Sequence, residues 1–156
     1  MFRKMRRKSQ ELTKWECEDI LTKQPRGILA LLGDYDYPYA VPMSHVYVDG
    51  KIYFHGAKTG HKIDAINNHP KVSYCVLDEG IKQKDSWWYT FKSVIVFGRL
   101  RTIEDEETKI EKLTYLGNKF FPTEEETKDE IDRLLDVTEL YEITIDHMSG
   151  KIVQEK

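Results

Sequence analysis

The sequence predicts a mainly β domain, in which five or six antiparallel strands form a barrel or sandwich and short helices lie at its periphery. Segments with the composition of strands follow one another with short turns between them, which favours this architecture over a parallel sheet of β-α-β units. Asp49-Gly50, between two such segments, is a strong two-residue hairpin signal. A chain of 156 residues suits a single domain that spans residues 1–156.

Six segments are rich in the β-branched, aromatic and apolar residues that strands favour. They are residues 27–32, 38–48, 51–55, 72–77, 87–102 and 140–145. The fifth is long enough for one or two strands, and Gly98 within it marks a bulge or a close backbone approach. Residues 78–86 are expected to form a polar connection, and Ser149-Gly150-Lys151 a turn before the C-terminus.

Four further segments have helical patterns. Thr13 and Glu16 have the spacing of a capping box, which predicts a helix over residues 14–23. The other three carry an apolar side or acidic residues near their start, and they are residues 61–68, 105–116 and 123–135. Residues 1–10 are basic and polar, and we expect them to form an N-terminal arm.

Composition narrows the function classes. The formal net charge of −3 argues against a general nucleic-acid binder. No apolar run approaches the roughly 20 residues that cross a bilayer, and no signal core follows the basic N-terminus. Cys17 and Cys75 are too isolated for a disulfide framework, and they suit a reducing compartment as free thiols. We therefore expect a cytoplasmic protein without nucleic-acid or membrane partners.

The segment from Pro42 to Lys62 carries the strongest functional signal. A hairpin is followed by the glycine-spaced loop 56–60 and then by His61-Lys62 at the start of a helix. Backbone N–H groups in such a loop and at a helix N-terminus lack partners, so they can donate to a phosphate, to which Lys62 adds a full positive charge. The alternative is a solvated loop with a surface lysine.

Histidines provide the other candidate chemistry. His55, at the end of the third strand, is a possible proton carrier, since an imidazole has a pKa of about 6.5; the alternative is a histidine satisfied at a sheet edge. Nothing beside His45 suggests chemistry. The histidines lack the spacing of a metal site, so we expect no metal. No GxSxG elbow and no GxGxxG fingerprint is present.

Several motifs occur in a recognisable order. The run YPYAVPMSHVYVDGKIYFHGAKTGHKIDAINNHPKVSYCV, followed by SVIVFGRLR and ITIDHMSGK, resembles the FMN-binding split barrels related to pyridoxamine 5′-phosphate oxidase. More narrowly, with the N-terminal MRRK, it is similar to the 5-nitroimidazole resistance or nitroimidazole reductase-like branch. The resemblance implies a six-stranded antiparallel split β-barrel that forms a homodimer with FMN at the subunit interface.

The resemblance also implies a set of residues that contact the cofactor. These are Val41, Pro42, Met43, Ser44, His55, His61, Lys62 and Ser93. Among them, His61 and Lys62 would hold the phosphate, and His55 would act on the substrate as the catalytic residue. Ser44 stands where a true pyridoxamine phosphate oxidase would carry a lysine, and the C-terminal SGKIVQEK lacks that enzyme's basic motif. The sequence therefore argues against vitamin B6 oxidation.

Three functions remain after the sequence is considered. The first is an FMN-dependent oxidoreductase that reduces a small substrate, such as a 5-nitroimidazole-like nitroaromatic compound. The second is a module of the same fold that binds flavin or haem without turnover. The third is a structural or partner-binding barrel. The hydride chemistry of the first would belong to the flavin, with the protein positioning it and tuning its electronics.

Overall fold

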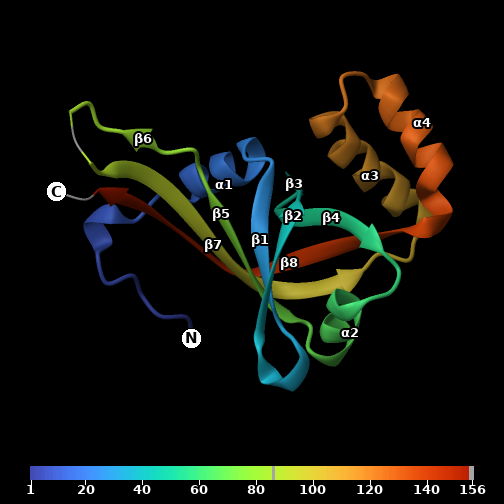
Figure 1. The fold of residues 1–156 in the computed structure, drawn as a ribbon, viewed down its shortest axis with the longest axis horizontal. Coiled ribbons are helices and arrows are strands. Elements are labelled where there is room, and N and C mark those ends of the chain that lie inside the picture. Colours follow the sequence, from blue (N-terminus) through green and yellow to red (C-terminus); the bar gives the residue numbers. More distant parts are fainter. Residues whose placement is uncertain (86, 155–156) are drawn as a thin grey trace.

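One antiparallel sheet curls into a half-barrel with helices around it, as Figure 1 shows for the computed structural model, which describes residues 1–85 and 87–154. The strands are β1 (Arg26–Leu32), β2 (Pro38–Ser44), β3 (Val46–Val48), β4 (Lys51–Ala57), β5 (Lys71–Leu77), β6 (Ile81–Lys82), β7 (Tyr89–Thr102) and β8 (Thr138–Gln154). Neighbouring strands follow the order β2-β1-β5-β7-β8-β4-β3, and β6 pairs with β7 outside this path. The mainly β architecture predicted from the sequence is confirmed.

The prediction of six strands was wrong, because the path among the described residues contains seven and β6 adds a short eighth. Residues 38–48 form two strands, β2 and β3, with His45 between them. The backbone N–H of His45 donates to the Pro25 carbonyl (3.2 Å) instead of to a sheet neighbour, and its buried ring bonds to the Leu21 carbonyl (2.8 Å). The chain thus crosses here from one end of the sheet path to the other. The remaining strand, β6, lies in the connection expected over residues 78–86, of which Ser86 lies outside the described residues.

The turn predicted at Ser149-Gly150-Lys151 was also wrong. These residues lie inside β8 and pair with Ile95, Val94 and Ser93 of β7. The long β7 supplies ladder partners over this whole stretch, so the small residues stay extended. The bulge expected at Gly98 is confirmed, since the register between β7 and β8 shifts between Phe97 and Gly98.

Four α-helices occupy the segments predicted for them. They are α1 (Lys14–Lys23), α2 (His61–Asn68), α3 (Glu106–Phe120) and α4 (Glu124–Leu134), with short 3-10 turns at Lys8–Gln10, Asp34–Asp36 and Leu135–Val137. The capping box at Thr13 and Glu16 is confirmed. The helices α3 and α4 form a hairpin beside the ends of β4 and β8 (Figure 1). No helix in the described part of the chain is long and apolar enough to span a membrane.

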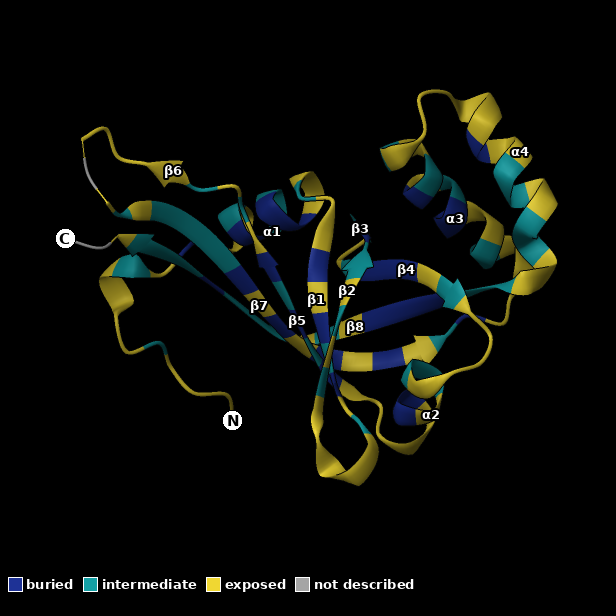
Figure 2. Ribbon diagram, in the orientation of Figure 1, coloured by how far each residue is buried: buried dark blue, intermediate teal, exposed yellow. Residues whose placement is uncertain are grey.

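Two buried clusters organise the domain. The larger lies on the inner face of the curled sheet and includes residues of α1 and α2. The smaller joins α3 to the sheet, and its buried members are Val46, Tyr53, Ile103, Leu113, Leu116 and Leu140. Figure 2 shows the alternation of buried and exposed residues along β1 and β7 that places one face of each strand in the larger core.

The outer face of the sheet retains exposed apolar side chains. Ile28 on β1, Cys75 on β5 and Ile95 on β7 are register neighbours across three strands. Ile95 is 41% exposed, and Phe97, two residues further along β7, is 40% exposed. The N-terminal arm reaches this face, where the Phe2 ring stacks on Phe97. Adjacent exposed apolar residues of this kind often mark an interaction surface.

Candidate functional site

The glycine-spaced loop leads into α2 as the sequence predicts. Gly60 precedes the helix with φ of 122°, and no side chain caps the first turn. Ile63 is the first residue of the helix whose N–H donates back to the Gly60 carbonyl (2.8 Å). The N–H groups of His61 and Lys62 come before it, so they are the donors that an uncapped helix N-terminus offers to an anion.

The Lys62 side chain turns inward from this helix. Its Nζ lies 3.7 Å from Met43 Sδ on β2 and 5.7 Å from the centroid of the Tyr141 ring on β8. Burial lowers the pKa of Lys62 below its ordinary value of 10.5. No carboxylate among the described residues forms an ion pair with this ammonium group. Burying part of a cation without an anionic partner raises the free energy of the folded protein, because the charge loses hydration. A bound anion would offset this desolvation penalty.

Gly56 on β4 makes room for this lysine. A Cβ built on Gly56 would lie 2.9 Å from Lys62 Nζ and 3.3 Å from the Tyr141 ring. A side chain here would therefore displace the ammonium group. The structure gives a packing role to the first glycine of the predicted loop.

His61 stands beside Lys62 but is held differently. Its ring stacks on Tyr39 of β2, with centroids 4.3 Å apart, and its Nε2 accepts from the backbone N–H of Asp34 (3.3 Å). The same nitrogen is 3.7 Å from a carboxylate oxygen of Asp34. His61 thus ties α2 to the turn between β1 and β2, and its Nδ1 remains the group able to reach a ligand.

The four candidate residues of β2 divide between the two faces of the strand. Val41 and Met43 pack against the larger core, whereas Pro42 is exposed. Ser44 lines a cavity on the other side from Met43. Because β2 is the end of the sheet path, one of its edges has no neighbouring strand in the described chain. A ligand along that edge would contact residues from both faces of the strand, Met43 on one and Ser44 on the other.

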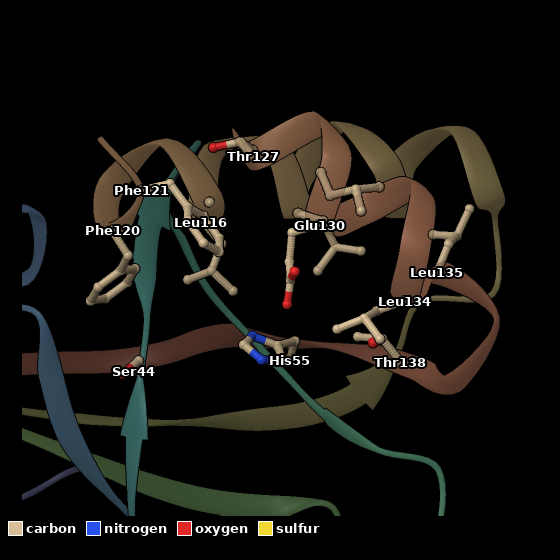
Figure 3. Close-up of a pocket in the computed structure, with 13 residues that line it drawn as sticks. Ser44, His55, Leu116, Phe120, Phe121, Thr127, Glu130, Leu134, Leu135 and Thr138 are labelled. Carbon is tan, nitrogen blue, oxygen red and sulfur yellow. The ribbon is translucent and has the colours of Figure 1, made fainter. Parts of the chain in front are cut away.

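A cavity between the α3–α4 hairpin and the sheet, open to solvent on one side, has a volume of about 250 Å³. Figure 3 shows its residues: Ser44 and His55 come from β2 and β4, while Phe120 ends α3 and Phe121 follows it. The other lining residues are Leu113, Leu116, Gly117, Thr127, Glu130, Ile131, Leu134, Leu135 and Thr138. Most of this wall is apolar, which suits a compact hydrophobic ligand.

Close packing of the two helices shapes this cavity. A Cβ on Gly117 of α3 would collide with the Cγ2 of Thr127 on α4, so glycine is what allows α4 to approach. Thr127 is buried, and its hydroxyl donates to the Thr123 carbonyl (3.3 Å) at the start of α4. The close approach of α3 and α4 above the cavity therefore depends on Gly117 and Thr127. No sequence motif indicated this role.

His55 lies on the floor of the cavity, with Glu130 reaching toward it from α4 (Figure 3). His55 remains exposed to solvent at the open side of the cavity. Desolvation by the surrounding protein, and then the positive charge of Lys62, nevertheless lower the pKa of His55 below its ordinary 6.5, and the Glu130 carboxylate opposes them. The ring is therefore neutral at pH 7. A neutral imidazole can donate from one nitrogen and accept at the other, as a proton carrier must.

Ser93 lies on β7, three strands from β2 in the sheet path, and far along the sheet from His55. Its partner on β8 is Lys151, whereas the partner of His55 is Leu140, so the two residues lie at opposite ends of that strand. The structure thus groups Met43 with Lys62 and Ser44 with His55, and it leaves Ser93 remote. Glu130 was missed from the sequence, because it lies in an acidic helix face that reads as solvated.

His45, for which the sequence suggested no chemistry, has a structural role. His45 is fully buried, and its Nδ1 lies 3.0 Å from the Tyr74 hydroxyl. Burial and the nearby charge of Lys119 lower the pKa of His45 to about 4. Lys119 itself donates to the carbonyls of Gln24 (2.6 Å) and His45 (2.9 Å), and so fastens α3 to the end of α1. Among the described residues, no group of three or more His, Cys, Asp or Glu side chains is arranged to hold a metal.

Solved structures share this architecture. A protein described as a candidate 5-nitroimidazole antibiotic resistance protein from Bacteroides thetaiotaomicron matches with a TM-score of 0.75 and 19% identity, over 91% of this chain and 86% of its own. An FAD-binding protein from Mesorhizobium loti matches with a TM-score of 0.70 and 24% identity, over 93% of this chain and 98% of its own. A flavocytochrome from Azotobacter vinelandii matches with a TM-score of 0.76 and 20% identity, over 97% of this chain and 73% of its own.

Sequence comparison supports the same grouping. No curated protein sequence matches the chain. The family model described as pyridoxamine 5′-phosphate oxidase matches residues 13–152, which include β1 to β7, β8 as far as Ile152, and every candidate site residue. The chain belongs to the pyridoxamine 5′-phosphate oxidase family.

Proposed function

We propose that this protein binds FMN and uses it to reduce a small substrate. The observation that carries the proposal is the ammonium group of Lys62, a residue of the uncapped first turn of α2, which is partly buried and has no anionic partner among the described residues. The terminal phosphate of FMN supplies a dianion that this cation and the first N–H groups of α2 would bind. The resident flavin would supply hydride chemistry.

The free edge of β2 is where we place the flavin ring. Backbone groups on an unpaired strand edge are hydrogen-bond donors and acceptors, and a flavin ring carries both along one side. A flavin ring there would lie along Val41, Pro42, Met43 and Ser44. The phosphate of the same FMN molecule would lie toward His61 and Lys62. His55 would then lie on the substrate side, where its neutral imidazole can exchange a proton with a reacting molecule.

We also propose a homodimer with FMN at the subunit interface. The exposed apolar face around Ile28, Ile95 and Phe97 supports this proposal, since a twofold interface uses one patch on both subunits. Ser93 supports it as well, because β7 lies three strands away from β2 in the sheet path, so Ser93 would approach the flavin of a partner subunit. The two free thiols, Cys17 and Cys75, suit a location in the cytoplasm.

A 5-nitroimidazole-like compound is the substrate we favour. The similarity in fold to the Bacteroides thetaiotaomicron protein supports it, as do the aromatic walls of the cavity above His55. The second candidate function is a flavin- or haem-binding module without turnover. It is favoured by the similarity in fold to the FAD-binding protein and to the flavocytochrome.

Spectroscopy of the purified protein tests the proposal. We expect a yellow protein with a flavin absorbance band that a reductant bleaches and a 5-nitroimidazole restores. A colourless protein whose melting temperature does not change in excess FMN would contradict it, because a ligand at 100 times its Kd stabilises by about 2.7 kcal/mol. A reducible flavin that no nitro compound reoxidises would favour the second function, and a Soret band would identify haem.

A further inference from the structure

Glu130 brings a negative charge into the middle of the α3–α4 cavity. Figure 3 shows its carboxylate directed down into the cavity toward His55. One oxygen, Oε2, accepts from Arg133, whose side chain is 69% exposed to solvent. The other oxygen, Oε1, accepts no hydrogen bond from the described residues. An exposed helix ion pair of this kind contributes little, so it leaves the carboxylate able to bind a second donor.

Arg133 pairs with Glu130 from outside the cavity lining, and the described residues that line the cavity include no lysine or arginine. His55 is the one other titratable side chain among the residues that line it, and its imidazole is neutral at pH 7. Lys119 on α3 turns away, because its ammonium group is bound by two backbone carbonyls near α1. Lys62 contacts Met43 and Tyr141 on the other side of β4.

Size and lining restrict the shape of a ligand. A volume of about 250 Å³ is below the roughly 300–1,000 Å³ of pockets for drug-sized molecules, and it suits a single substituted ring. The rings of Phe120 and Phe121 and the leucines of α3 and α4 form the apolar walls. A ligand that fills this space must therefore be largely apolar, with its polar group directed at His55 and Glu130.

We infer that this cavity is the substrate site and that Glu130 selects a small aromatic molecule bearing a protonated amine or an N–H donor. The donor meets the Glu130 carboxylate, and the ring packs between Phe120 and the helix leucines. Anionic molecules of the same shape are repelled. The inference rests on the proposed flavin function only for the identification of this ligand as substrate, since binding to the cavity requires no flavin.

Three single-ring probes of matched shape test the selection: benzylamine, benzyl alcohol and benzoate. Their Kd values are measured by NMR titration of the His55 imidazole signal, in protein with and without FMN. We expect benzylamine to bind at least about tenfold more tightly than benzoate, the effect of one charge-assisted hydrogen bond. Glu130→Gln should remove this preference. Asp129→Asn is the matched control, because it removes one charge from the same turn of α4 at an exposed residue that does not line the cavity.

The outcomes separate this inference from the proposed function. Equal affinities for benzylamine and benzoate, or equal effects of Glu130→Gln and Asp129→Asn, would overturn the inference while FMN binding could still be intact. A preference for benzylamine that depends on Glu130 in a protein that binds no FMN would support the charge selection and contradict the flavin function.

Discussion

His55 and Lys62 lie on opposite sides of β4, yet the charge of the lysine acts on the histidine. The imidazole faces the cavity under α3 and α4, whereas Lys62 Nζ lies where a Cβ of Gly56 would point, on the other face of the strand. After burial, the Lys62 charge is the largest cause of the lowered pKa of His55. The proposed phosphate site at Lys62 and the imidazole of His55 are thereby coupled through one strand.

This coupling predicts a change in titration. Replacing the lysine with a neutral side chain in Lys62→Met should raise the pKa of His55 toward 6.5, because a nearby positive charge disfavours imidazolium. Conversely, Glu130→Gln should lower it, since the carboxylate favours the charged ring. NMR titration of the His55 ring protons between pH 4 and 8 measures both. An unchanged pKa in Lys62→Met would show that the two groups are not coupled.

Removing the imidazole should separate binding from turnover. We expect His55→Ala to retain FMN and to slow reoxidation of the reduced flavin by a 5-nitroimidazole by about 10²-fold or more, the usual contribution of general acid–base catalysis. Stopped-flow absorbance follows the flavin directly. His69→Ala, at an exposed histidine that ends α2, is the control and should react at the normal rate. Loss of FMN from His55→Ala would instead place this residue among those that hold the cofactor.

The helix contact above the cavity predicts a stability effect. Gly117→Ala introduces a Cβ that collides with Thr127, and we expect it to lower the free energy of unfolding by about 1–3 kcal/mol, as overpacking does. Thr127→Ser removes the colliding methyl group but keeps the hydroxyl that bonds to Thr123. Urea unfolding of both single variants and the double variant gives the coupling energy. If the cost of Gly117→Ala is the same in both backgrounds, the two residues are not in the contact described here.

The outer sheet face predicts an effect on assembly. Ile95→Lys places a charge among exposed apolar side chains, and we expect a monomer that binds FMN more weakly, because the flavin site would need both subunits. Ile110→Lys is the matched control: Ile110 is 38% exposed on α3, close to the 41% of Ile95. Sedimentation velocity measures the mass of each variant. A monomeric native protein that binds FMN with full affinity would refute the interface proposal.

Local patterns in the sequence predicted most of the fold. The capping box, the hairpin signal and the strand compositions each depend on neighbouring residues, and the structure confirms α1, the β3–β4 turn and the mainly β sheet. The division of residues 38–48 could not be predicted in this way, because it depends on contacts of His45 with Pro25 and Leu21 that form only after folding. The same holds for the length of β8, which is set by its partner β7.

The candidate site was predictable only in part. The loop before α2 and Lys62 were visible because glycine spacing and a following cation form a local pattern. Strand alternation places Met43 and Ser44 on opposite faces of β2. The sequence alone did not show that one face contacts the larger core and the other lines the α3–α4 cavity. Glu130 and Gly117 lie more than fifty positions after the loop, and nothing near them in the chain marks a binding function. Their roles arise from the packing of α3 and α4 over β4.

A comparative FMN titration tests the central claim most directly. Fluorescence quenching of FMN should show tight binding to the native protein and to Lys58→Ala, which removes an exposed lysine from the same loop. Lys62→Ala should weaken binding by about 1.5–3 kcal/mol, the range for hydrogen bonds to charged groups. Equal affinities of Lys62→Ala and Lys58→Ala for FMN would contradict the phosphate site at Lys62.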